Sequence, residues 1–138
     1  MKPSFEELKQ ELKNKNINMS YQRLKVLEYL TKNRCHPTVE HIFTDLHKEI
    51  PTLSKTTVYN TLKMLAEAGL VRIINIDEHE TRYDINTKTH GHFKCGCCEK
   101  IYDFELNTDL LISKDLNNFK INDKNVYFKG VCQKCLTY

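Results

Sequence analysis

No part of this 138-residue chain approaches the run of about 20 apolar residues that a membrane-spanning helix needs. The first 15 residues also lack the apolar core of a secretory signal peptide. Internal repeats and low-complexity tracts are missing as well, which excludes a repeat architecture. We therefore expect a cytoplasmic globular protein with no membrane partner.

Glycine and net charge are both scarce. The chain has 4 glycines and no glycine-rich loop that could enclose a substrate, which argues against an enzyme. The net charge is +3, so the charge of the whole chain gives little reason to expect a nucleic-acid partner. The local charge gives more, because residues 51–66 contain Lys55 and Lys63 and no acidic side chain. This segment is the first candidate for a DNA-binding surface.

Cysteine, by contrast, occurs in a spaced pattern. Of the 6 cysteines, four form two Cys-X-X-Cys pairs that lie far apart in the sequence. Small domains usually need a disulfide or a bound metal for stability. Because cytoplasmic thiols stay reduced, metal binding is favoured over disulfides. Zn²⁺ in a structural site takes four thiolates in a tetrahedron, and each pair offers two. We predict a structural zinc site with four ligands: Cys95, Cys98, Cys132 and Cys135.

Two alternatives to this zinc site stay open. The pairs could be redox-active dithiols, although neither is expected to begin a helix after a strand as thioredoxin-like sites do. Cys97 could also replace Cys98 as the partner of Cys95. We prefer Cys98 because its spacing mirrors that of the second pair.

Capping residues and apolar periodicity predict helices in the first part of the chain. The expected N-caps are Ser4, Ser20, Thr38 and Ser54. Gly69 is expected to end the last of these helices. Two β-rich segments, residues 70–76 and 81–85, then flank a polar turn and predict a hairpin. Helices followed by a hairpin are typical of a winged helix, so residues 1–85 are predicted to be a winged-helix DNA-binding domain.

Residues 86–89 are short and polar, and they are the candidate hinge between two domains. Beyond them the pattern predicts strands over residues 92–95, 100–104 and 121–131 and a helix over residues 106–117. These elements are too few to enclose a core alone. Residues 90–138 are therefore predicted to form the α/β dimerisation and metal-binding domain of a homodimer, and the fold class is α+β.

His90 and His92 form a second candidate metal-binding motif. In an extended backbone their imidazoles lie on one face, directly before the first zinc cysteine. Asp84 and Asp103 could add oxygen ligands, although each alone is typical of a solvated surface charge. His36, in the loop after the second helix, indicates no function by itself.

Together these motifs cover essentially the whole chain and resemble the ferric uptake regulator superfamily. They are Gln22-Arg23, His36-Pro37-Thr38, residues 54–59, the His-X-His block before Cys95, and the final Cys-X-X-Cys pair. The resemblance implies a regulatory metal with five ligands: His36, Asp84, His90, His92 and Asp103. An aspartate rather than a glutamate at position 103 is similar to the peroxide-responsive branch of the superfamily.

The ligands that the resemblance implies are three imidazoles and two carboxylates without a thiolate, a set suited to Fe²⁺ or Mn²⁺. In the peroxide-responsive branch, Fe²⁺ reacts with peroxide and oxygen is added to a ligand histidine, here His36 or His90. The resemblance thus implies a metal-dependent transcriptional repressor that leaves DNA on oxidation. The alternatives are a repressor that senses the concentration of iron, zinc or manganese directly and, from another class, a small metalloenzyme.

The helix that begins at Ser54 is the candidate recognition helix for the major groove of a DNA operator, an inverted repeat in the case of a dimer. The candidate DNA contacts are Arg23 and Lys55 with phosphates, and Thr56, Thr57, Tyr59 and Asn60 with bases. Arg72 and Arg82 of the hairpin are expected near the flanking DNA. One metal shared across residues 86–89 would couple metal binding to the spacing of the two recognition helices.

Overall fold

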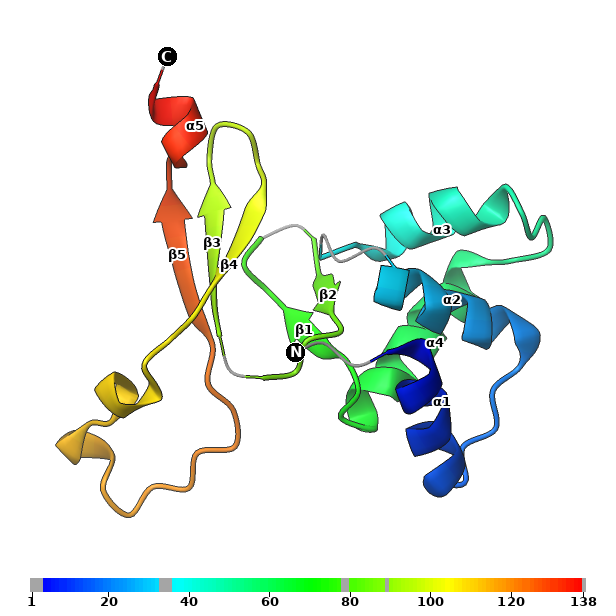
Figure 1. Cartoon of the computed structure of the whole chain (residues 1–138), viewed down its shortest axis with the longest axis horizontal. Helices are drawn as coiled ribbons and strands as arrows, with labels where there is room; N and C mark the ends of the chain where they lie inside the picture. Colours follow the sequence, from blue (N-terminus) through cyan, green and yellow to red (C-terminus); the bar gives the residue numbers. More distant parts are fainter. Residues whose placement is uncertain (1–3, 33–35, 78–79, 89, 138) are drawn as a thin grey trace. The chain divides into compact units, whose positions relative to one another are not determined.

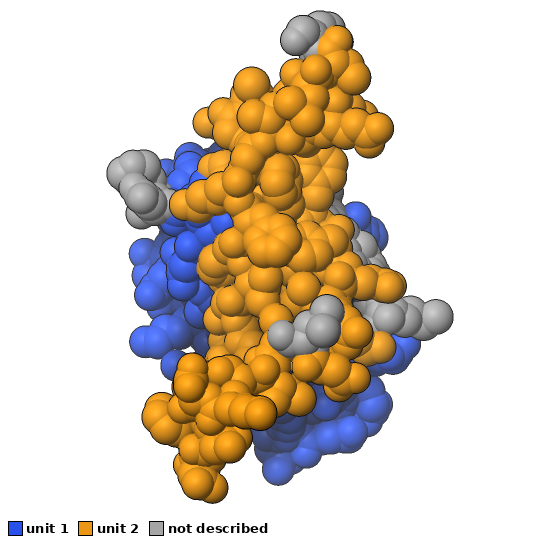
Figure 2. Space-filling view, turned by 90° about the vertical axis from the view of Figure 1, so that its left-hand side faces the viewer, with its two compact units in different colours: residues 1–87 blue, residues 88–138 orange. Residues whose placement is uncertain are grey.

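The computed structural model of the chain describes residues 4–32, 36–77, 80–88 and 90–137, except for the side chains of Thr108 and Leu110. The chain divides into two compact units, residues 1–87 and residues 88–138, which Figure 2 shows in different colours. The division falls within residues 86–89, the candidate hinge. No helix in the described ranges combines the length and the apolar character needed to cross a membrane.

The described part of unit 1 consists of helices followed by a hairpin, as the winged-helix prediction required (Figure 1). The elements are α1 (Phe5–Asn14), α2 (Tyr21–Lys32), α3 (Val39–His47), α4 (Lys55–Glu67), β1 (Arg72–Ile74) and β2 (Arg82–Asp84). Helix α4 packs against α2 and α3, and α1 packs against α2. The core between them is aliphatic and includes Leu12, Leu27, Ile42, Val58 and Leu62, each almost fully buried.

All of the predicted N-caps are confirmed. In each case the hydroxyl accepts a hydrogen bond from the backbone N–H three residues later, at 3.2 Å for Ser4, 3.3 Å for Ser20, 3.1 Å for Thr38 and 3.1 Å for Ser54. Such a cap contributes about 1 kcal/mol to helix stability. Gly69 follows α4 with a φ of 77°, and the N–H groups of Gly69 and Leu70 bond back to the carbonyls of Ala66 and Leu65. This arrangement ends α4 directly before the hairpin.

The hairpin of unit 1 is also bonded to the segment that precedes α3. Strands β1 and β2 are antiparallel, with Arg72 opposite Asp84. The N–H of Tyr83 donates to the carbonyl of Pro37 at 3.0 Å, and Thr38 forms a β-bridge with Arg82. The strands are shorter than the predicted segments, residues 70–76 and 81–85, because the apolar residues flanking them are buried in the core rather than paired.

The described part of unit 2 contains a three-stranded sheet with the order β4-β3-β5. Its elements are β3 (Gly91–Cys95), β4 (Ile101–Phe104), the 3₁₀ turns η1 (Thr108–Leu111) and η2 (Lys114–Leu116), β5 (Val126–Gly130) and α5 (Gln133–Leu136). Strand β3 lies in the middle, antiparallel to β4 and parallel to β5. With the winged helix of unit 1, this sheet confirms the predicted α+β fold class.

Of the elements predicted for unit 2, the helix is wrong and the last strand is shorter than expected. The helix over residues 106–117 is replaced by η1 and η2, because the side chains of Asn107 and Ser113 accept backbone N–H groups two residues later and favour tight turns over an α-helix. The strand over residues 121–131 is shortened to β5, because Asp123 bonds to the backbone of Lys124 and the side chain of Asn125. The sequence alone did not indicate α5 or the parallel pairing of β5 with β3.

Candidate metal centres and recognition helix

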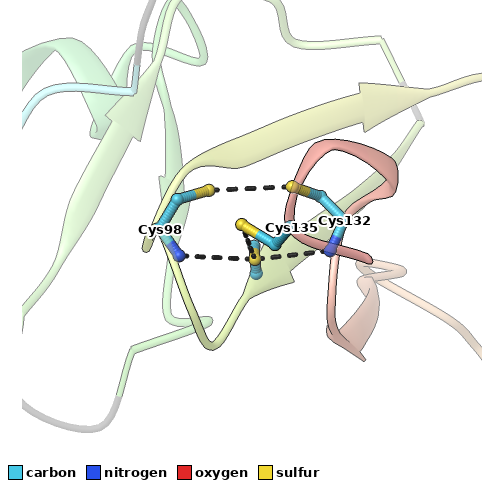
Figure 3. A group of neighbouring side chains, drawn as sticks. Cys98, Cys132 and Cys135 are labelled. Carbon is cyan, nitrogen blue, oxygen red and sulfur yellow. Dashed lines mark hydrogen bonds between the residues drawn. The ribbon is translucent and has the colours of Figure 1, made fainter. Parts of the chain in front are cut away.

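The four cysteines of the predicted zinc site come from two connections of unit 2 that the sheet brings together (Figure 3). Cys95 is the last residue of β3, and Cys98 lies in the turn that follows it. Cys132 is the N-cap of α5, and Cys135 lies within that helix. The Sγ atoms of Cys95 and Cys135 are 3.8 Å apart, as are those of Cys98 and Cys132, and all four sulfurs lie within 4.8 Å of one another.

These sulfur separations fit a tetrahedral metal ion. With Zn–S bonds of about 2.3 Å, the sulfurs of a tetrahedron are separated by about 3.8 Å, whereas a disulfide would bring two of them to about 2 Å. The donor set is all thiolate, which suits zinc. The four residues present therefore fit a structural zinc ion.

The backbone prepares Cys95 to bind a metal. The N–H groups of Cys132, Cys98 and Cys97 donate to its sulfur at 3.3, 3.5 and 3.3 Å and lower the pKa of the thiol to about 6. A hydrogen bond from the Tyr102 hydroxyl lowers the pKa of Cys132, whereas a hydrogen bond with Cys132 raises the pKa of Cys135. Since the thiolate is the ligand form, metal binding would displace the protons that the remaining thiols retain.

One argument against redox-active dithiols was wrong. The second cysteine pair does begin a helix after a strand, because Cys132 is the N-cap of α5 and follows β5. The sulfur geometry provides the stronger argument, since the two 3.8 Å separations join cysteines of different pairs. Cys97 is exposed and its thiol is outside the group of four, and Cys35 lies outside the described residues.

In unit 1, His36 and Asp84 form one part of the predicted regulatory site. The Nε2 atom of His36 lies 3.5 Å from Oδ2 of Asp84, and both residues are 4% exposed. The other carboxylate oxygen of Asp84 accepts the N–H of Asn86 at 2.9 Å. His36 has a φ of 56°, in the left-handed region that residues other than glycine rarely adopt. A buried imidazole beside a buried carboxylate is a pair of metal-ligand type.

In unit 2, His90, His92 and Asp103 form the other part. His92 on β3 is directly opposite Asp103 on β4, and Oδ1 of Asp103 lies 3.4 Å from Nε2 of His92 and 3.5 Å from Nε2 of His90. Nδ1 of His90 donates to the carbonyl of Lys88 at 2.6 Å, which leaves its Nε2 as the metal-binding atom. The two histidines are buried. The register of β3 and β4 thus brings together three side chains that can bind a metal.

Helix α4 presents its predicted DNA face to solvent. The exposed side chains are Lys55, Thr56, Tyr59, Asn60 and Lys63, and we call them the recognition face. Thr57 is half-buried, and its hydroxyl lies 2.9 Å from that of the cap Ser54. Arg23 of α2 is half-buried, with its guanidinium 3.7 Å from the sulfur of Met64. The recognition face therefore has the exposure that contact with DNA requires.

Two contacts of basic residues were not anticipated from the sequence. Lys55 forms an ion pair with Glu40 of α3 at 2.7 Å, and sequence periodicity gives no sign of this contact because the pair joins two helices. An exposed pair of this kind is worth about 0–1 kcal/mol, so a DNA phosphate could displace the glutamate. Arg82, which we expected near DNA, is largely buried and bonds to Asp77 and to the carbonyl of His36. These contacts leave little of the Arg82 side chain exposed, so its expected position near DNA stays a prediction.

Comparison with known proteins shows which family this chain resembles. Residues 14–129 match the ferric uptake regulator family. The chain is 34% identical over 127 residues to the peroxide operon regulator of Bacillus subtilis, covering 90% of this chain and 88% of that protein. It is 31% identical over 127 residues to the peroxide-responsive repressor PerR of Staphylococcus aureus, covering 90% and 86%.

Solved structures extend the likeness to the fold. PerR from Streptococcus pyogenes, a protein of peroxide sensing and gene regulation, matches with a TM-score of 0.57 and 28% identity. The match covers 98% of this chain and 95% of that chain. The Helicobacter pylori ferric uptake regulator matches with a TM-score of 0.74 and 22% identity, covering 95% and 90%, and shows the fold alone. From the family match and these relatives, we conclude that the chain belongs to the ferric uptake regulator family.

Proposed function

We propose that this protein is a metal-dependent transcriptional repressor that senses peroxide. One observation carries the proposal: each unit contributes ligand-type groups that converge within the unit, His36 with Asp84 and His90 and His92 with Asp103. Two relatives, at 34% and 31% identity, are a peroxide operon regulator and a peroxide-responsive repressor, which supports the same function. We expect such a repressor to act in the cytoplasm, where bacterial DNA is found.

The regulatory metal in this proposal is Fe²⁺ or Mn²⁺, held by both sets of ligands together. Three imidazoles and two carboxylates without a thiolate would suit either ion. When bound, Fe²⁺ would supply the electron that reduces peroxide, whereas Mn²⁺ would not. The chain supplies the groups that hold the ion and the imidazoles that receive oxygen, His36 or His90. Oxidation removes a good ligand, so the protein loses its metal and its affinity for DNA.

The proposed partners are a second copy of the chain and an inverted-repeat operator. Unit 2 exposes large apolar side chains that a solvated surface rarely leaves uncovered: Ile112, Phe119, Ile121, Phe128, Val131 and Leu136. Burial of these residues against a second copy would give the homodimer. An ion that binds ligands of both units would then restrain the separation of the two α4 helices, which must match half-sites about 34–36 Å apart.

We expect the contacts of α4 with DNA to separate into two kinds. Asn60→Ala should weaken operator binding by about 1–3 kcal/mol and leave binding to random DNA unchanged, because an asparagine reads base edges. Lys55→Ala should weaken both and reduce the slope of log affinity against log salt by about 1, because a lysine binds phosphate. Lys48→Ala, an exposed lysine beyond α3, is the control. Equal losses on operator and random DNA for Asn60→Ala would contradict base reading.

The peroxide proposal is tested by mass spectrometry of protein loaded with Fe²⁺ or Mn²⁺ without oxygen. After peroxide, the Fe²⁺ form should gain one oxygen at His36 or His90 and lose its DNA affinity, and the Mn²⁺ form should change in neither respect. Asp103→Glu should still bind Fe²⁺ and operator DNA but gain oxygen more slowly, because the longer side chain moves the carboxylate relative to His90 and His92.

Other outcomes would favour the other functions. Fe²⁺-loaded protein that stays unmodified and DNA-bound under peroxide would indicate a repressor that senses the concentration of iron, zinc or manganese. Consumption of many peroxide molecules per chain would indicate a small metalloenzyme, since a sensor that is oxidised at its own ligand reacts once.

A further inference from the structure

Arg82 makes a set of contacts that the proposed function does not use. Its Nε donates to Oδ2 of Asp77 at 2.9 Å, and its Nη1 donates to the backbone carbonyl of His36 at 3.1 Å. The side chains of Arg82 and Asp77 are 13% and 11% exposed, so water screens their contacts little. A third, looser contact reaches Glu80, which is 55% exposed, at 4.0 Å. The guanidinium thus joins the end of the first hairpin arm to the segment that precedes α3.

The residue held by this guanidinium has an unusual backbone. His36 has a φ of 56°, where a side chain crowds its own backbone. Such a conformation persists only when surrounding contacts impose it. The bond from Arg82 restrains the carbonyl of His36, and the bond from Tyr83 N–H to the Pro37 carbonyl restrains the next peptide. The left-handed conformation determines the direction in which the imidazole leaves the chain.

Two residues of strand β2 contact His36, one at its backbone carbonyl and one at its imidazole. Arg82 and Asp84 are two residues apart on the strand, so their side chains share one face. Arg82 binds the carbonyl of His36, and Asp84 lies 3.5 Å from its imidazole Nε2. From this arrangement we infer that Arg82 is the positioning residue of the regulatory site, which keeps His36 in its ligand conformation before the metal binds. The inference rests on the proposed function, because it assigns Arg82 a role in that site.

The chemistry of arginine suits this task better than that of lysine. The planar guanidinium donates through Nε and Nη1 to two acceptors at once, in a fixed geometry. A lysine would keep the charge beside Asp77 but could not hold both acceptors in that geometry. Arg82→Lys therefore separates the positioning of His36 from simple charge balance in the hairpin. Glu80→Gln is the matched control, because it removes a charge near the same guanidinium but touches neither the Asp77 pair nor His36.

The test uses the full-length zinc-loaded protein and Mn²⁺ as the probe. Arg82→Lys should weaken Mn²⁺ binding by about 10- to 100-fold, the usual effect of losing a group that orients a ligand. Glu80→Gln should change it less than twofold. In Fe²⁺-loaded protein, Arg82→Lys should also lower the share of added oxygen found at His36 relative to His90, which a merely structural role would not change. Circular dichroism of the zinc-loaded variant without Mn²⁺ checks that unit 1 remains folded.

Arg82→Gln provides a second variant in case the lysine finds one of the acceptors, and its loss of Mn²⁺ affinity should be at least as large. If both folded variants bind Mn²⁺ like the wild type and keep the oxygen distribution, Arg82 does not position His36. If the wild type itself binds no Mn²⁺ beyond its zinc, the proposed function fails instead. If the salt slope of metal-free DNA binding falls by about 1 in Arg82→Lys while Mn²⁺ affinity holds, Arg82 is a phosphate contact and the inference is overturned.

Discussion

Cys98→Ser is expected to release the zinc and unfold unit 2. Structural zinc binding supplies folding free energy on the order of 10 kcal/mol, which is comparable to the whole stability of a small domain. The described sheet of unit 2 has three short strands and many exposed apolar side chains, so little else can replace the metal. Metal analysis should find the variant without zinc, and sedimentation should find the dimer lost.

Cys97→Ser is the matched control for this experiment. Its thiol is exposed and next to Cys98 in sequence, but it is not one of the four sulfurs that lie within 4.8 Å. We expect this variant to keep one zinc per chain and an unchanged sedimentation coefficient. If Cys97→Ser loses the zinc and Cys98→Ser keeps it, the ligand pair is Cys95 with Cys97.

His92→Ala is expected to abolish the effect of metal on DNA binding and to leave the zinc in place. His92 is 2% exposed and lies 3.4 Å from Asp103, so its loss removes a central ligand of the proposed regulatory site. A metal that tightens DNA binding about 100-fold provides about 2.7 kcal/mol of coupling, and this coupling should vanish. Operator binding should be titrated with and without Mn²⁺.

The control for His92→Ala is His47→Ala, which removes an exposed histidine at the end of α3. It should retain both the zinc and the response to Mn²⁺. A loss of zinc in His92→Ala would contradict the separation into two metal sites, because His92 and the zinc cysteine Cys95 would then belong to one centre.

The helices of unit 1 could be predicted because their signals are local. A hydroxyl that caps a helix bonds to an N–H three residues away, so Ser4 and Ser54 marked their helices without information from elsewhere in the chain. Gly69 ended α4 for an equally local reason, the positive φ of its backbone. The same approach failed over residues 106–117, where an apolar pattern suggested a helix but Asn107 and Ser113 bonded to nearby backbone instead.

The metal-ligand sets show a similar division. The two Cys-X-X-Cys pairs and the His-X-His motif are recognisable as ligands in the sequence because each motif contains its own partner. His36, Asp84 and Asp103 have no such partner nearby. The residues alone left the two aspartates undecided and gave His36 no function, and the resemblance to a known family added all three to the ligand set. In the structure, the register of β3 and β4 brings Asp103 opposite His92, and the bridge between Thr38 and Arg82 brings the segment after His36 beside β2.

The sequence by itself therefore determined the helices of the winged domain, the thiolates of the zinc site and the exposed face of α4, because short-range bonding and periodicity encode each of them. Only the tertiary structure decided that Cys95 lies 3.8 Å from Cys135, that Lys55 pairs with Glu40, and that Arg82 binds the carbonyl of His36. Each of these contacts joins residues separated by at least fifteen positions. Such contacts depend on how helices and strands pack together. The local sequence pattern of one segment does not indicate which distant residues it will contact.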